Sequence, residues 1–188
     1  MVLVHGSPLS SLEFRATIAR LLPRFRTVAP DLLSFGHSLG PPDGADFTQQ
    51  AEALRSFLDA LDLDRFHLVG HDWGGPIGLA AAARRPEQLD RLVLQNTTVR
   101  ATFRPPLYWR PMTAPRLGEL ALQRANLFSL GLPLLLRAVR KDRELRRRYA
   151  EPLKNPATRR TILKLERQQG YTDECLLIER CPRCTAPS

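Results

Sequence analysis

The sequence has 188 residues, of which 43% are hydrophobic and 25% are charged. This is the composition of an ordinary globular chain, and it argues against a disordered or fibrous protein. The sequence has no window of about 18 apolar residues, which argues against a membrane-spanning helix. Met1 is followed by Val-Leu-Val-His-Gly rather than by the basic and apolar regions of a secretory signal, so we expect a cytoplasmic protein.

The formal net charge of +9 is concentrated in one part of the chain. Residues 100–170 contain 17 Lys or Arg and only 5 Asp or Glu, whereas the segments on either side are slightly acidic. A basic block can indicate a nucleic acid or an anionic membrane as partner. Here arginines are interspersed with leucine and alanine, which favours a solvated helical face. We therefore expect neither a nucleic acid nor a membrane as partner.

Short apolar runs alternate with helical patterns along residues 1–99. We expect strands at 1–4, 27–29, 66–69 and 89–94, which alternate along the chain with helices at 12–22, 47–61 and 73–84. Strands separated by helices of about 10–15 residues predict an α/β fold with a mostly parallel sheet flanked by helices. Thr48 has a side-chain acceptor at the start of one helical pattern and is the expected N-cap.

Two further zones follow this α/β part. Residues 100–170 show helical patterns interrupted by prolines and have no strand signal, and residues 171–188 form an irregular tail. The tail holds Cys175 and a Cys181-x-x-Cys184 pair. Three cysteines do not make a disulfide framework, and a structural zinc site needs four ligands. We therefore expect no metal and no cofactor.

The segment Gly70-His71-Asp72-Trp73-Gly74 lies between an expected strand and an expected helix. In a nucleophile elbow, the nucleophile lies at a strand-to-helix turn, and small residues stand two positions before it and two positions after it. The N-terminus of the following helix offers free N–H groups and a positive dipole to a developing anion. A carboxylate at this position suits displacement at a saturated carbon, which leaves an alkyl ester on the enzyme. The simpler alternative is that Asp72 only caps the helix.

A second candidate segment, His5-Gly6-Ser7-Pro8, follows the first expected strand. We expect its turn to bring the backbone N–H of Ser7 close to Asp72. Together with the N–H of Trp73 it would make a two-donor oxyanion hole, in which each donor is worth about 3 kcal/mol in the transition state.

Four segments resemble the haloalkane dehalogenase and epoxide hydrolase branch of the α/β-hydrolase superfamily. The most specific is the elbow segment 70–78, and the others are 5–15, 30–38 and 92–97. The resemblance implies a partial α/β-hydrolase fold over residues 1–99 with a helical cap over 100–170. It also implies hydrolysis of carbon–halogen bonds through an aspartyl ester, with a small haloalkane as substrate.

The resemblance also implies roles for individual residues. Asp72 would be the nucleophile, and the indole N–H of Trp73 would stabilise the leaving halide. Ser7 stands where many dehalogenases have an asparagine that also binds halide. His5, Gly6 and His71 would support the site from its neighbourhood.

Epoxide hydrolases, the sibling group, use tyrosines of the cap to protonate the opening ring. Tyr108 and Tyr149 are the candidates here, and Trp109 is a further possible cap contact. A third hypothesis is an inactive relic of the fold or a ligand-binding module.

The sequence departs from the family pattern in two places. The general base of the family is a histidine far downstream of the nucleophile, but the four histidines here are His5, His37, His67 and His71. The chain also begins at the position of the family's third strand. We therefore expect a chain truncated at both ends that completes at most half of the catalytic cycle, because the base that activates water is missing.

Overall fold

The computed structural model describes residues 1–97, 107, 110–127, 129, 131 and 141–168. Its sheet has three parallel strands in the order β1 (Val2–Val4), β2 (Phe66–His71) and β3 (Leu89–Gln95). Helices separate the strands along the chain, as a parallel arrangement requires. The predicted α/β fold is therefore confirmed, and β2 is the central strand that ends at the candidate nucleophile.

The strand expected at 27–29 is reduced to a single bridge. Val28 pairs with Val2, donating its N–H to the carbonyl of Met1 and accepting the N–H of Leu3, both at 2.9 Å. Pro30 follows two residues later and has no N–H to donate, so the ladder cannot continue there.

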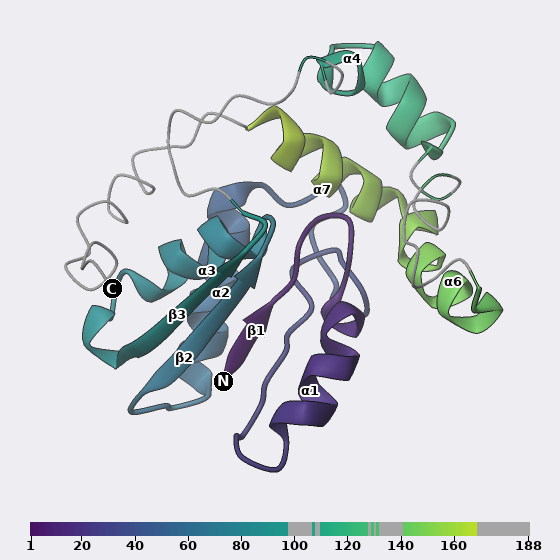
Figure 1. Cartoon of the computed structure of the whole chain (residues 1–188). Helices are drawn as coiled ribbons and strands as arrows, with labels where there is room; N and C mark the ends of the chain where they lie inside the picture. Colours follow the sequence, from purple (N-terminus) through teal and green to yellow (C-terminus); the bar gives the residue numbers. More distant parts are fainter. Residues whose placement is uncertain (98–106, 108–109, 128, 130, 132–140, 169–188) are drawn as a thin grey trace.

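Helices cover the two faces of the sheet unequally (Figure 1). α2 (Phe47–Ala60) and α3 (Gly74–Ala82) pack together on one face, while the 3-10 turn η1 (Ser11–Phe14) and α1 (Arg15–Leu21) lie on the other, beside β1. Side chains alternate between the faces of a strand. Val2 and Val4 accordingly belong to the main core, whereas Leu3 packs with Phe14 in a smaller cluster.

Helix boundaries differ from the prediction in ways that capping explains. Asp46, not Thr48, is the N-cap of α2, and it forms a capping box with Gln49, in which each side chain bonds the other residue's backbone N–H. The expected helix at 12–22 begins as the 3-10 turn η1 and continues as α1. A short 3-10 turn, η2 (Pro86–Gln88), connects α3 to β3.

The described residues beyond position 107 form helices and no strand, as predicted. These are α4 (Arg110–Thr113), the π-helix η4 (Glu119–Arg124), α6 (Arg143–Ala150), the 3-10 turn η5 (Pro152–Lys154) and α7 (Pro156–Arg167). α7 passes over the carboxyl ends of the strands (Figure 1). Among the described helices, none combines the length and the hydrophobicity that a membrane span requires. The tail expected at 171–188 lies outside the described residues.

The main core joins α7 to the α/β part. Ile162, Leu163 and Leu165 of α7 are buried in the same cluster as Phe47 and Trp73. Burial of such side chains is worth roughly 1.5–3 kcal/mol each. This packing holds α7 over the bend that follows β2.

Candidate active site

Asp72 occupies a sharp bend between β2 and α3. Its φ angle is +49°, a left-handed conformation that non-glycine residues rarely adopt. Its amide donates to the carbonyl of Gln95 at 3.2 Å, and its own carbonyl accepts the amide of Gly75 at 3.0 Å and the hydroxyl of Thr97. A Cβ on Gly74 would lie 2.1 Å from the carbonyl oxygen of Val4, so only glycine fits there. The local geometry is that of the predicted elbow.

Two backbone amides face the Asp72 carboxylate. The amide of Ser7 donates to Oδ1 at 2.9 Å, and the amide of Trp73 acts to lower the pKa of the carboxyl group. Burial raises the pKa of Asp72, while these two amides and the charge of His71 oppose the rise. A Cβ on Gly6 would lie 2.5 Å from the Cβ of Asp72, so a larger residue would displace the carboxylate. The structure thus brings together the two segments that the sequence singled out.

His5 is fully buried and supports the turn that carries Ser7. Its Nε2 accepts the amide of Leu32 at 2.9 Å, which leaves Nδ1 to donate to the carbonyl of Gly6 at 2.9 Å. Burial lowers the pKa of His5 to about 4, so the ring is neutral at physiological pH. The imidazole therefore acts as a neutral brace between the turn and the loop at residue 32.

His71 forms an ion pair that the sequence analysis missed. Its Nδ1 lies 3.1 Å from Oε2 of Glu13, a residue of η1. The hydrogen bond with Glu13 raises the pKa of His71, and burial raises the pKa of Glu13. A carboxylate–imidazole pair thus lies next in sequence to the candidate nucleophile, Asp72. The two residues are 58 positions apart, and no local pattern links them.

The indole of Trp73 is bound to a carboxylate of α7. Its Nε1 donates to Oε1 of Glu166 at 3.1 Å, and its ring centre lies 6.4 Å from that of Phe47. Trp73 is 5% exposed and Glu166 is 8% exposed. The donor that the resemblance assigns to a halide is therefore engaged by an acidic side chain that the sequence analysis did not consider.

Of the expected cap contacts, only Tyr149 lies within the described residues; Tyr108 and Trp109 lie outside them. Tyr149 is a buried residue of α6 whose hydroxyl lies 3.4 Å from Nη1 of Arg15. Burial raises the pKa of Tyr149. It packs with Leu145 against the segment that follows Ser7.

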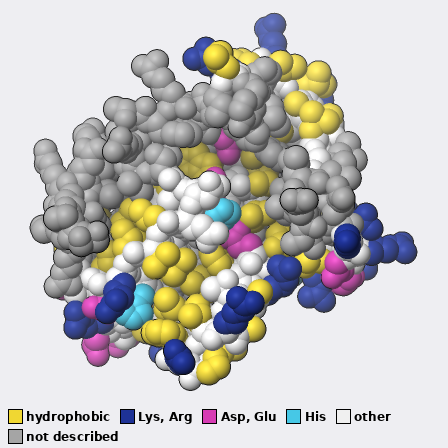
Figure 2. All heavy atoms as spheres, in the orientation of Figure 1, with side chains coloured by type: hydrophobic (Ala, Val, Ile, Leu, Met, Phe, Trp, Pro, Cys, Tyr) yellow, Lys and Arg dark blue, Asp and Glu magenta, His cyan; other side chains and the backbone are white. Residues whose placement is uncertain are grey.

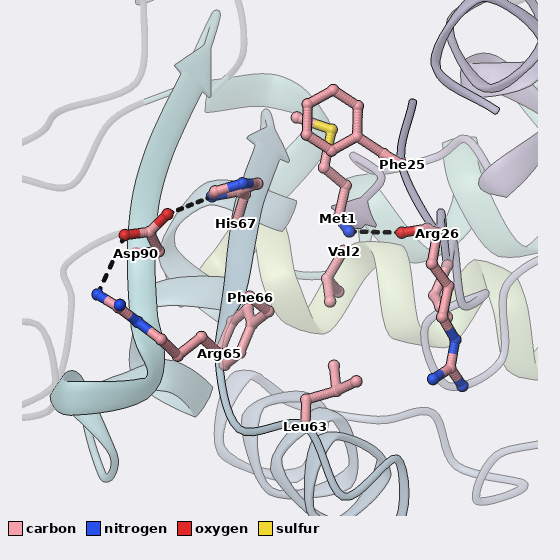
Figure 3. A pocket seen from close by; sticks show the side chains of 10 residues that line it. Met1, Val2, Phe25, Arg26, Leu63, Arg65, Phe66, His67 and Asp90 are labelled. Atoms are coloured by element: carbon pink, nitrogen blue, oxygen red, sulfur yellow. Dashed lines mark hydrogen bonds and ion pairs between the residues drawn. The ribbon is translucent and has the colours of Figure 1, made fainter. Parts of the chain in front are cut away.

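A cavity of about 330 Å³ lies at the other end of the sheet (Figure 3). Its walls include His67, whose Nδ1 is 3.2 Å from Asp90, and Arg65, which reaches the same carboxylate at 3.3 Å. His67 is near the start of β2 and Asp72 follows its end, so this cavity is separate from the elbow. In the part of the chain that the structure describes, no group of three acidic, His or Cys side chains is placed to hold a metal.

Comparison with known proteins gives concordant matches. Haloalkane dehalogenase 2 of Mycobacterium tuberculosis is 34% identical over 171 residues, which is 89% of this chain and 59% of that protein. A haloalkane dehalogenase of Mesorhizobium japonicum is 31% identical over 182 residues, with 89% and 57% covered. The chain thus spans less than two thirds of the length of these relatives.

A solved structure and a decarboxylase add to these matches. The crystal structure of a haloalkane dehalogenase from Agrobacterium tumefaciens C58 superposes with a TM-score of 0.81 at 27% identity, covering 100% of this chain and 68% of that one. A cis-3-alkyl-4-alkyloxetan-2-one decarboxylase of Shewanella oneidensis is 40% identical over 101 residues, covering 52% of this chain and 32% of that protein.

A family model described as the alpha/beta hydrolase fold matches residues 1–157. This match covers most of the chain and includes the turn at Ser7, the elbow at Asp72 and the first helices beyond the sheet. The chain belongs to the α/β-hydrolase fold family, and its relatives within that family include haloalkane dehalogenases.

Proposed function

We propose that this chain carries out carbon–halogen cleavage of the haloalkane dehalogenase type, with Asp72 as the nucleophile. The observation that supports this most directly is the carboxylate of Asp72 at a strand-to-helix bend, where the amide of Ser7 donates to it and the amide of Trp73 favours its charged form. Names of relatives at 34% and 31% identity support the same reaction class. The proposed substrate is a small haloalkane.

The chemistry follows from the charge on the carboxylate. An oxygen of Asp72 attacks the carbon that bears the halogen, a C–O bond forms, and the C–halogen bond breaks. The halide leaves with the bonding electron pair, and the anionic carboxylate becomes a neutral alkyl ester. When water later attacks the ester carbon, negative charge develops on an oxygen of Asp72. The amides of Ser7 and Trp73 are placed to stabilise it.

Release of the product requires a base that activates water. All four histidines of the sequence lie at or before position 71, and the two nearest to the site are already engaged, His5 as a neutral brace and His71 with Glu13. We therefore propose that residues 1–188 form the ester but do not turn it over.

Intact-mass spectrometry after incubation with a short bromoalkane tests this proposal. We expect a mass increase equal to one alkyl group less one hydrogen, mapping to the peptide with Asp72, and bromide release that stops at one equivalent. Asp72→Asn is the matched control and should give no adduct, because an amide is a far weaker nucleophile. Sustained bromide release would contradict the half-cycle, and the absence of any adduct would favour an inactive relic or a binding module.

The same measurement with a terminal epoxide tests the sibling activity. Opening an epoxide requires a proton donor for the ring oxygen, and Tyr149 is the described candidate, with its hydroxyl near Arg15. An adduct on Asp72 that forms with the epoxide and not with the bromoalkane would favour an epoxide hydrolase. Loss of that adduct in Tyr149→Phe would assign the proton donor.

A further inference from the structure

The buried side chain of Glu166 binds the indole of Trp73, the residue that directly follows the proposed nucleophile. Its Oε1 accepts the indole N–H of Trp73 at 3.1 Å, and both side chains are more than nine-tenths buried. The backbone amide of Trp73 meanwhile favours the charged form of the Asp72 carboxylate. Trp73 thus faces the proposed nucleophile with its backbone and contacts an acidic side chain of α7 with its indole.

The helix that carries Glu166 is fastened to the loop before α2 by residues that shortly precede Glu166. Thr161 accepts the amide of Ala45 at 2.8 Å, and Lys164 donates to the carbonyl of Gly44 at 2.8 Å. Leu165, the neighbour of Glu166, is fully buried in the main core. These contacts leave α7 little freedom to withdraw Glu166 from the indole.

A carboxylate and a halide compete for this donor. An indole has a single N–H and accepts no hydrogen bond through it. An ionised Glu166 would hold this N–H about twice as strongly as a neutral acceptor would, and it would repel a halide strongly away from water. The N–H of Trp73 therefore cannot stabilise a departing halide while Glu166 holds it.

We propose that Glu166 is a specificity-determining residue, which withholds the indole N–H of Trp73 from the leaving halide. This inference rests on the proposed function. Without a donor on the halide, the rate of ester formation depends on the intrinsic ability of the halide to leave. The chain should therefore alkylate Asp72 quickly with iodoalkanes and bromoalkanes and slowly with chloroalkanes, since one lost donor of this kind typically costs about 100-fold or more in rate.

Halide binding gives a direct test that needs no catalysis. The Trp109→Phe background leaves Trp73 as the sole tryptophan, because the sequence has two. Sodium bromide is titrated into this protein, and the saturable quenching of Trp73 fluorescence reports occupancy of the indole site. We expect no saturable quenching in the background protein, and saturable quenching when Glu166→Leu is added. Equal quenching in the two proteins would overturn the proposal.

Two further variants keep the test decisive. Glu166→Gln has the shape of the native side chain and removes only the charge, so it should bind bromide more tightly than the background protein even if Glu166→Leu does not fold. Unchanged bromide binding in a folded Glu166→Gln would overturn the proposal. Glu119→Gln is the matched control, because Glu119 pairs with Arg167 at 2.7 Å, next in sequence to Glu166, and should leave bromide binding unchanged.

The rate of Asp72 alkylation provides the second readout. The ratio of bromoalkane to chloroalkane rates should fall by about tenfold or more in Glu166→Leu, because the freed donor helps the poorer leaving group most. In Trp73→Phe, which lacks the N–H, the same change at Glu166 should leave the ratio unaltered. If adducts form but the ratio does not change in Glu166→Leu, the role of Glu166 is contradicted and the proposed function is not. A lack of adduct in every variant contradicts the proposed function, and bromide quenching then still decides the role of Glu166.

Discussion

At the scale of single residues, the ionised form of the candidate nucleophile Asp72 costs stability, whereas the ionised form of a second carboxylate, Asp31, contributes stability. Asp72 is half-buried, has a positive φ angle and has a pKa that burial raises, so its ionised form is disfavoured in the folded chain. Asp31 is the opposite case. Burial alone would raise its pKa, but the amides of His37 and Ser11 outweigh burial and lower it. Strain concentrated at one catalytic position is a common feature of active sites.

Asp72→Asn should therefore stabilise the protein at neutral pH. In the wild type, ionisation of Asp72 lowers stability as pH rises from the ordinary carboxyl pKa of 3.8 through the raised folded value. Asparagine does not ionise and tolerates a positive φ angle, so we expect a gain of about 1 kcal/mol, or roughly 2–4 °C in melting temperature. Melting curves across the pH range measure the difference in melting temperature between the variant and the wild type, which should shrink as the pH falls toward 4.

Asp31→Asn is the control of opposite sign. Because the folded pKa of Asp31 is lowered, its ionised form stabilises the fold above the ordinary pKa of 3.8, and that stability is lost as pH falls through the folded value. The Asp31 variant should melt below the wild type at neutral pH. Destabilisation by both substitutions would argue that Asp72 is not held in an unfavourable ionised state.

At the scale of elements, α7 and the loop before α2 stabilise each other. Thr161 accepts the buried amide of Ala45 at 2.8 Å, and the hydroxyl of Thr158 donates to the carbonyl of Ser34. Gly44 has a φ angle of +87°, and a Cβ there would lie 2.6 Å from the amide nitrogen of Thr161. Loop and helix are thus fitted closely, which is how a helix more than a hundred residues away is held over the elbow.

Thr161→Val tests this connection. Valine has nearly the same shape as threonine but no oxygen, so the buried amide of Ala45 would lose its acceptor. We expect a loss of about 1–2 kcal/mol in the free energy of unfolding, measured by urea denaturation. Thr161→Ser keeps the hydroxyl and should lose clearly less. An equal loss in the two variants would show that packing of the methyl group, not the hydrogen bond, holds the loop.

The elbow, the Ser7 amide and the parallel sheet could be predicted because each has a local signature. Glycines around Asp72 and the turn after the first strand mark close backbone approaches in the sequence itself. The pairs Trp73–Glu166 and His71–Glu13 could not be predicted, because they join residues 93 and 58 positions apart. Such pairs depend on how elements pack, and neither periodicity nor turn chemistry encodes that.

At the scale of the whole molecule, hydrophobic surface is exposed along the edge of the sheet. Val93 and Leu94 of β3 are 49% and 39% exposed, and hydrophobic side chains gather on the face of the molecule shown in Figure 2. Within the described residues β3 pairs only with β2, so its outer backbone groups are a template for another strand. A strand edge of this kind favours self-association.

Val93→Lys should reduce that self-association. A lysine on an edge strand opposes pairing with a second strand, so light scattering should show less concentration-dependent growth than in the wild type. Leu39→Lys is the matched control, because Leu39 is 88% exposed in a loop and adds the same charge away from the edge. An equal reduction in both variants would assign the effect to net charge rather than to β3.

The tight bend after β2 also has a consequence for how the chemistry of this fold can change in evolution. The steric restrictions fall on Gly74, which faces the carbonyl of Val4, and on Gly6, which faces the Cβ of Asp72. The side chain at position 72 is restricted by its backbone angle and by the close approach of Gly6, which leave room for a short polar group. A lineage that keeps both glycines can therefore exchange a carboxylate for a hydroxyl through changes in one codon, and so pass from attack on alkyl carbon to attack on acyl carbon without rebuilding the scaffold.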